Sequence, residues 1–123
     1  MGFEETITIT KEIVQNFANL IGDYNPVHLD DEYARKSKFG KPIVHGMLLA
    51  SFFSKIIATK YPGEGSIYVS QNIRFIKPCF VGDSITIKIN LISIKDKKHI
   101  LSTQILNSEG YVIVDGDASV LKD

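Results

Sequence analysis

The chain has 123 residues, a length that suits one domain. Hydrophobic residues make up 44% of it and charged residues 23%, as in a folded globular protein and unlike a disordered or low-complexity chain. Fourteen Lys and Arg residues balance fourteen Asp and Glu residues. Nucleic acid and anionic membrane surfaces are therefore not expected as partners.

The use of cysteine and the start of the chain indicate a reducing compartment. Cys79 is the single cysteine, so an intramolecular disulfide is excluded. The first residues show neither a signal peptide nor an Arg-rich presequence. The longest uncharged run, residues 42–54, is too short to span a bilayer. We therefore expect a cytoplasmic protein.

The first part of the chain predicts a short strand followed by helices. Residues 6–10 alternate Thr and Ile, the period of a strand. Thr10 then caps a predicted helix that ends at Gly22. Asn25-Pro26 interrupts regular helix over residues 23–31, because proline pushes its predecessor into extended geometry. A short polar helix is expected over residues 31–37, with Asp30 as its cap.

The remaining elements predict an α+β fold. Residues 47–59 are apolar on nearly every face, which is typical of a helix buried on all sides. Strands are expected over residues 66–75, 85–91, 101–105 and 112–120, with short turns between them. We predict a single hot-dog domain over residues 1–123, in which a curved antiparallel five-stranded sheet wraps a central buried helix, with a short helical overhang.

Asp23 and His28 are the first candidates for chemistry. Pro26 lies between them and breaks the helix, so a turn can bring the carboxylate and the imidazole toward a shared point. Such a pair can hold a water molecule and move protons, as hydration and dehydration require. The alternative is plain turn chemistry, with Asp23 bracing the turn and His28 as a surface histidine.

Gly46 stands at the start of the predicted central helix, directly after His45. A helix N-terminus offers unpaired amide hydrogens and the positive end of a dipole. Glycine lets a ligand approach these amides, where a thioester oxygen would be stabilised as negative charge develops on it. Helix packing or an N-cap role is the alternative explanation for this glycine.

Four segments resemble one family over essentially the whole chain. Residues 22–28, Gly-Asp-Tyr-Asn-Pro-Val-His, are similar to the signature of the (R)-specific enoyl-CoA hydratases, the MaoC-like family of hot-dog proteins. Residues 42–51 resemble the stretch that opens the central helix in short bacterial members. Residues 63–68 and 74–83 are also similar, although such strand segments occur in many hot-dog proteins.

The resemblance implies an activity and a set of site residues. The activity is reversible syn addition of water to a trans-2-enoyl-CoA of short or medium chain length, giving an (R)-3-hydroxyacyl-CoA without a metal or redox cofactor. The resemblance makes Asp23 and His28 the catalytic dyad and the amide of Gly46 the oxyanion donor. Ser54 matches a serine that supports the dyad. Ile57 matches a residue lining the acyl pocket, although core packing explains it equally well.

The family also implies a homodimer, with larger assemblies left open, whose acyl-CoA pocket lies at the dimer interface. From the roles above we expect Asp23 to act as general base on water and His28 to deliver a proton to the α-carbon. The two duties are interchangeable, because a coupled pair titrates together. Asn25 is expected to brace the turn.

The other reactive side chains receive structural interpretations. His45 is expected to make a structural hydrogen bond at the start of the central helix, and His99 to be exposed in a hairpin. The three histidines and one cysteine show no metal-ligand spacing. Lys95, Lys97 and Lys98 suit a charged hairpin tip better than a site for coenzyme A phosphates. A nucleophilic role for Cys79 has weak support.

Two other functions compete with the hydratase. A hot-dog thioesterase would share the fold, but the Asp23 to His28 segment argues against it. A non-catalytic acyl-CoA sensor or dimerisation module is disfavoured because Asp23, His28, Gly46 and Ser54 are all present. The acyl chain length, the pathway, the physiological direction and the choice between coenzyme A and a carrier protein stay open.

Overall fold

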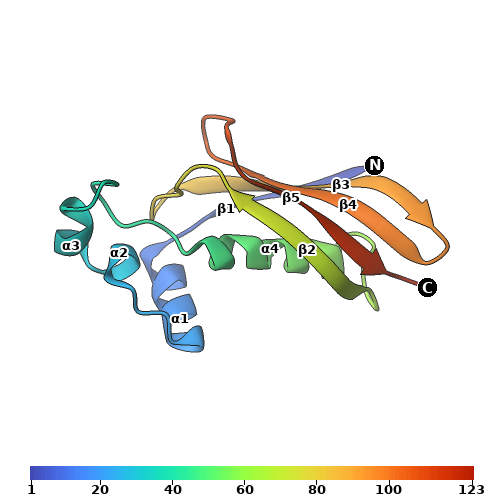
Figure 1. Cartoon of the computed structure of the whole chain (residues 1–123), viewed down its shortest axis with the longest axis horizontal. Coiled ribbons are helices and arrows are strands. Elements are labelled where there is room, and N and C mark those ends of the chain that lie inside the picture. The colour runs from blue at the N-terminus through green and yellow to red at the C-terminus, as the bar shows by residue number, and fades with distance from the viewer.

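Five antiparallel strands form one curved sheet in the computed structural model, which describes residues 1–123 (Figure 1). The order of the strands across the sheet is β1-β3-β4-β5-β2, so β1 and β2 are its edges. The strands are β1 (Gly2–Thr8), β2 (Ile67–Phe75), β3 (Ser84–Lys95), β4 (Lys98–Leu106) and β5 (Val112–Leu121). The five-stranded antiparallel sheet predicted from the sequence is confirmed.

Four helices accompany the sheet: α1 (Lys11–Ile21), α2 (Pro26–Leu29), α3 (Asp31–Arg35) and α4 (Gly46–Thr59). Helix α4 runs along the sheet, while α1, α2 and α3 gather beyond one end of it (Figure 1). Helices α1, α2 and α3 form the helical overhang that was predicted. None of the four helices combines the length and the apolar character that a membrane-spanning helix requires.

The hydrophobic core lies between α4 and the sheet. Strand β3 contributes Ile85, Ile87 and Ile89, which are buried, while the residues between them face the other side. This alternation follows from the pleat of a strand and places one apolar face on the helix. Helix α4 fills the space with five buried side chains, Leu48, Leu49, Phe53, Ile56 and Ile57.

The prediction that α4 is buried on all sides is wrong for the single chain. The sheet covers one side of the helix and leaves the other open. Met47 is 60% exposed, and Ser51 and Ser54 are also exposed on the open side. The apolar character of the helix around its whole circumference therefore exceeds what one sheet covers.

Several element boundaries differ from the prediction, and the start of β1 and the segment after Asn25 differ in kind. Strand β1 begins at Gly2, because its backbone pairs with β3 from Gly2 opposite Asn90 onward, and it ends at Thr8. Residues 26–29 form a one-turn helix where no helix was expected. Proline is tolerated at the first position of a helix, where its missing N–H is not needed. The proline therefore starts α2 and does not merely interrupt a helix.

Candidate active site

The turn between α1 and α2 places Asp23 and His28 on neighbouring segments. Gly22 ends α1 in the left-handed region, with φ 81°, and its N–H donates to the carbonyl oxygen of Ala18. Oδ1 of Asp23 then accepts the N–H of Asn25 over 3.2 Å. The side chain of Asn25 caps α2 by accepting the N–H of Val27. The predicted role of Asn25 as a brace agrees with this contact.

His28 is held in one tautomer. Its Nδ1 lies 2.7 Å from the carbonyl oxygen of Ile43, which can only accept a hydrogen bond. Nδ1 therefore carries the proton in the neutral ring, and Nε2 keeps its lone pair. Burial lowers the pKa of His28, and the neighbouring His45 lowers it further, while the bond to Ile43 and the charge of Asp23 oppose them. The result is a neutral base near physiological pH.

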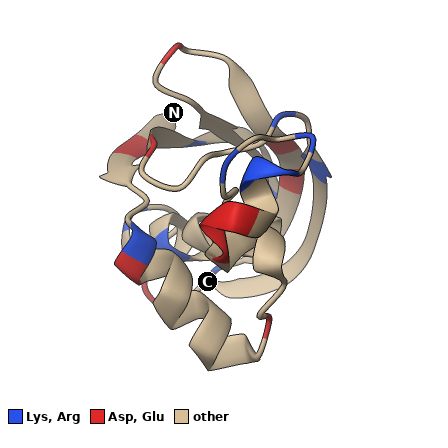
Figure 2. Cartoon of the chain, turned by 90° about the vertical axis from the view of Figure 1, so that its left-hand side faces the viewer, with Lys and Arg blue, Asp and Glu red and all other residues tan.

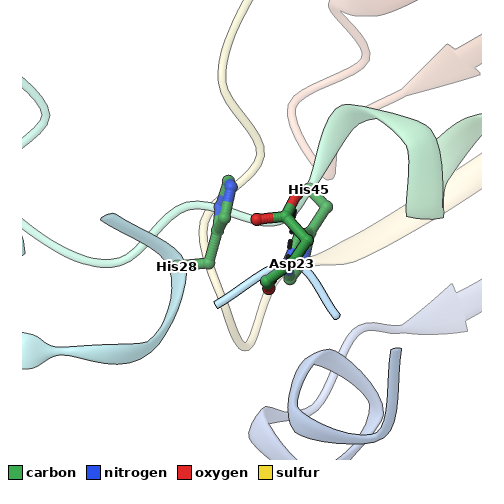
Figure 3. A group of neighbouring side chains, drawn as sticks. All are labelled: Asp23, His28 and His45. Carbon is green, nitrogen blue, oxygen red and sulfur yellow. Dashed lines mark hydrogen bonds and ion pairs between the residues drawn. The ribbon is translucent and has the colours of Figure 1, made fainter. Parts of the chain in front are cut away.

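Asp23 and His28 have the spacing of two groups that share one water molecule. A carboxylate oxygen of Asp23 and a ring nitrogen of His28 lie within 4.8 Å of each other. Two acceptors that bind the two hydrogens of one water stand about 4.5 Å apart. Figure 3 shows one carboxylate oxygen of Asp23 pointing toward the ring of His28. The side chain of Asp23 is 43% exposed, so water reaches it.

Gly46 presents a free amide to the same cavity. It is the first residue of α4, and neither its N–H nor that of Met47 donates a hydrogen bond within the chain. A Cβ atom at Gly46 would stand 2.8 Å from the ring of Phe75, so a larger residue would displace that ring. A cavity of about 490 Å³ is lined by Asp23, His28 and Gly46 together. The structure thus brings these three predicted residues to one place.

His45 was expected to be structural, and its Nε2 does donate to the carbonyl oxygen of Asp23 over 3.1 Å. The spacing of the histidines along the chain gave no sign of a cluster, but the rings of His28 and His45 stack at a centroid distance of 3.9 Å. The chain fold brings them together across seventeen residues, a distance that no local spacing reveals. His99 is half-buried on β4 against Tyr61, not exposed as expected.

Asp23, His28 and His45 lie close enough together to be considered as metal ligands. One potential ligand atom from each residue lies within 4.8 Å of the others. However, the nitrogen of His45 nearest to the Asp23 carboxylate is Nε2, which carries the proton donated to a carbonyl oxygen. A protonated ring nitrogen does not bind a metal. Two ligands remain, fewer than the three protein ligands of catalytic zinc sites.

Ser54 and Ile57 lie away from this cavity. Ser54 is exposed on the open side of α4, two turns beyond Gly46, and lines no part of it. Ile57 is 2% exposed and belongs to the hydrophobic core between α4 and the sheet. Within the single chain, packing in the hydrophobic core therefore accounts for Ile57.

Two lysines that the sequence analysis did not single out line the cavity. Lys38 and Lys77 border it, and neither forms an ion pair within the chain. Each ammonium lies over an aromatic ring, that of Phe39 and that of Tyr111 respectively. Figure 2, which looks onto the helical end of the molecule, shows both basic and acidic segments there. The only local sign of this arrangement in the sequence is Phe39, the aromatic residue directly after Lys38.

The lysines weighed in the sequence analysis lie elsewhere. Lys95 and Lys98 flank the turn between β3 and β4, at the end of the sheet opposite the helices (Figure 1). They therefore form the charged hairpin tip that was expected. Cys79 does line the cavity, but burial raises the pKa of its thiol to about 12, which leaves it unreactive as a nucleophile.

Comparison with known proteins identifies relatives along most of the chain. The MaoC like domain family matches residues 1–111. The (R)-specific enoyl-CoA hydratase of Aeromonas caviae is 44% identical over 109 residues, which are 87% of this chain and 81% of the relative. A mitochondrial 3-hydroxyacyl-[acyl-carrier-protein] dehydratase of Arabidopsis thaliana is 35% identical over 122 residues, 95% of this chain and 72% of the relative.

Solved structures agree with these relatives. The (R)-hydratase of A. caviae, described as involved in PHA biosynthesis, superposes with a TM-score of 0.97 at 37% identity, covering 100% of this chain and 95% of that one. The R-hydratase PhaJ1 of Pseudomonas aeruginosa gives a TM-score of 0.94 at 37% identity, covering 98% of this chain and 79% of that one. With its sheet, its central helix and the matched residues taken together, this chain belongs to the MaoC-like domain family and has its hot-dog fold.

Proposed function

We propose that this protein is an (R)-specific enoyl-CoA hydratase, which adds water reversibly to a trans-2-enoyl-CoA and forms an (R)-3-hydroxyacyl-CoA. The observation that carries the proposal is the convergence of Asp23, His28 and the free amide of Gly46 on one cavity. The similarity to the hydratases of A. caviae and P. aeruginosa supports the same reaction.

The pair supplies the proton transfers. Water donates one hydrogen bond to the carboxylate of Asp23 and the other to Nε2 of His28. As the water oxygen bonds to the β-carbon, Asp23 takes a proton from it, and the π electrons of the double bond move toward the thioester oxygen. A proton then passes from the pair to the α-carbon. One C–O bond and one C–H bond form, and the proton balance of the pair is restored.

The tautomer of His28 refines the expected division of labour. Since Nδ1 donates to Ile43, Nε2 of the neutral ring has no proton to give. His28 delivers a proton to the α-carbon only after Nε2 has received one, either from water directly or through Asp23. Both groups border one cavity, so hydroxyl and proton add from the same side, which gives syn addition.

Gly46 stabilises the intermediate charge. Its N–H points from the start of α4, where the helix dipole is positive, and has no other acceptor. A thioester oxygen that accepts this hydrogen bond gains stabilisation as it acquires enolate character. Because hydration changes no overall oxidation state and the pair moves the proton, the proposed reaction uses no resident metal or redox cofactor.

Coenzyme A is the proposed acyl carrier. Its phosphates are anionic, and Lys38 and Lys77 are unpaired cations at the cavity. The cavity volume of about 490 Å³ suits a thioester group with a short or medium acyl chain. The similarity to the Arabidopsis acyl-carrier-protein dehydratase makes the carrier-protein thioester the natural comparison substrate.

A homodimer is part of the proposal, since β2 is an edge strand beside the open side of α4. Ile67, Val69 and Phe75 on β2 are each more than half exposed, and Met47 adds to this apolar surface. A second copy paired along β2 would cover an edge that otherwise invites aggregation. Sedimentation of the purified chain is expected to give twice the mass of 13.7 kDa. A monomer at micromolar concentration would contradict this part.

The single cysteine supports a cytoplasmic location.

The reaction is tested with crotonyl-CoA by following its conjugated absorbance and free thiol together. A hydratase removes the absorbance, releases no thiol and gives the (R) enantiomer of the 3-hydroxy product. Release of coenzyme A would instead identify a thioesterase. Binding without either change, with crotonyl-CoA and with a longer enoyl-CoA, would identify a non-catalytic acyl-CoA module.

A further inference from the structure

His45 contacts both members of the catalytic pair. Its ring is 2% exposed and stacks on the ring of His28 at 3.9 Å, with an angle of 26° between the planes. Its Nε2 donates to the carbonyl oxygen of Asp23, which accepts no other hydrogen bond in the chain. The ring of Phe17 meets His45 edge-on at 5.1 Å and closes the remaining side.

The contacts of His45 differ in kind, and each requires a different property of the side chain. The bond to Asp23 needs a donor, so the neutral ring carries its proton on Nε2. The stack on His28 needs a flat ring of the right size. Nδ1 of His45 is buried and has no hydrogen-bond partner. A buried polar atom without a partner is rarely tolerated in a residue whose role is packing alone.

We propose that His45 is a positioning residue for the hydration, in which one ring fixes the backbone of Asp23 by a hydrogen bond and the plane of the His28 imidazole by stacking. The inference rests on the proposed function and adds a third side chain to it. His45 directly precedes Gly46, so the same residue also links the pair to the amide at the start of α4.

The arrangement also affects the titration of His28. Burial lowers the pKa of His28 and the neighbouring His45 lowers it further, so removal of the stacked ring is expected to raise it. The other charged groups around His28 are Asp23, Lys38 and Lys77 in the main cavity. Lys11 and Asp31 border a smaller cavity that His28 also lines. Replacement of His45 removes none of these charges.

Three substitutions separate the two contacts. His45→Gln keeps a donor but loses the ring, His45→Phe keeps a ring but loses the donor, and His45→Ala loses both. We expect kcat with crotonyl-CoA to fall about tenfold or more for Gln and Phe and about 100-fold for Ala, with smaller changes in KM, because misplacement by about 1 Å costs that much. His99→Gln, on β4 and outside the cavity, is the matched control.

The pH profile distinguishes positioning from general support of the fold. In each His45 variant the acid limb of kcat/KM moves to higher pH, whereas a purely structural role would lower the melting temperature and leave the limb in place. Folded variants with the kcat and acid limb of the unchanged protein overturn the proposal. Inactivity of the unchanged protein would instead count against the proposed function.

A second measurement needs no variant of the site to fold. Ring ¹⁵N spectra of the unchanged protein, with His99 assigned from His99→Gln, report the tautomers of the neutral histidines. We expect the proton of His45 on Nε2 and that of His28 on Nδ1, two opposite tautomers in one stack. A proton on Nδ1 of neutral His45 would overturn the proposal whether or not the protein hydrates crotonyl-CoA.

Discussion

Nδ1 of His28 donates to the carbonyl oxygen of Ile43 over 2.7 Å, and the N–H of Ile43 donates in return to the carbonyl oxygen of Val27. These two bonds join α2 to the segment that leads into α4. They hold the imidazole in one orientation and one tautomer, with the lone pair of Nε2 left free. The chemistry of the site follows from this connection, because an imidazole free to rotate would not present the same nitrogen at each turnover.

The pH dependence of activity follows from the lowered pKa of His28. The neutral ring accepts a hydrogen bond from water, and burial keeps it neutral below its ordinary pKa of 6.5. We therefore expect the acid limb of kcat/KM to have its midpoint below pH 6.5. An initial-rate profile with crotonyl-CoA measures this. A decline centred above 6.5 would contradict the assignment of His28.

The same shift predicts how stability depends on pH. Unfolded His28 binds a proton more readily than folded His28, so acid favours unfolding once the pH falls through 6.5. Part of the loss of melting temperature between about pH 8 and about pH 5 should disappear in His28→Gln, which has no such proton to bind. Equal losses in the two proteins would show that His28 does not contribute.

Gly46→Ala is expected to impair activity more than stability. The added Cβ would stand 2.8 Å from the ring of Phe75, which is 52% exposed and free to move. We expect a stability loss of about 1 kcal/mol, since only an exposed ring gives way. The displaced ring enters the cavity, and kcat falls about tenfold to 100-fold.

Phe75→Ala in the Gly46→Ala background provides the check, with Phe75→Ala alone as its reference. If the clash is the cause, the double variant recovers part of the lost kcat relative to Gly46→Ala. Gly46→Ala keeps the backbone N–H, so this variant with the kcat of the unchanged protein would show that the space above the amide is not needed in the reaction.

Lys77→Gln and Lys38→Gln test the recognition of the acyl carrier. An exposed ion pair contributes up to about 1 kcal/mol, so each change should raise KM for crotonyl-CoA about two- to fivefold with kcat retained. A crotonyl thioester of pantetheine, which lacks the phosphates, should show no such change. Lys98→Gln, at the opposite end of the sheet, is the control. An effect of Lys98→Gln equal to that of Lys77→Gln would place the phosphates at the hairpin instead.

The sequence was informative where local pattern determines structure. Alternating Ile85, Ile87 and Ile89 predicted a half-buried strand, and the structure has one. Pro26 and Asn25 predicted a turn that brings Asp23 and His28 together, which the geometry agrees with, although Pro26 also starts a helix. These features depend on residues close in the chain, so the sequence alone carries them.

The sequence was uninformative where distant segments meet. The stack of His45 on His28 depends on how α4 is placed against α2. The sequence pattern of neither segment indicates that the two lie in contact. Lys77 reaches the cavity because β2 ends beside α4, and nothing around Lys77 signals this. The open side of α4 was also not predicted. The apolar residues of this helix indicate burial, but they do not indicate which surface covers each side of it.

The most direct test of the central claim is the rate of crotonyl-CoA hydration by the unchanged protein, by Asp23→Asn and by His28→Gln. Asp117→Asn, an exposed position on β5, is the matched control. If the pair performs the chemistry, the unchanged protein and Asp117→Asn give the (R)-3-hydroxy product, while Asp23→Asn and His28→Gln stay folded and lose at least about 100-fold in kcat. Hydration by folded Asp23→Asn at the rate of the unchanged protein would contradict the account.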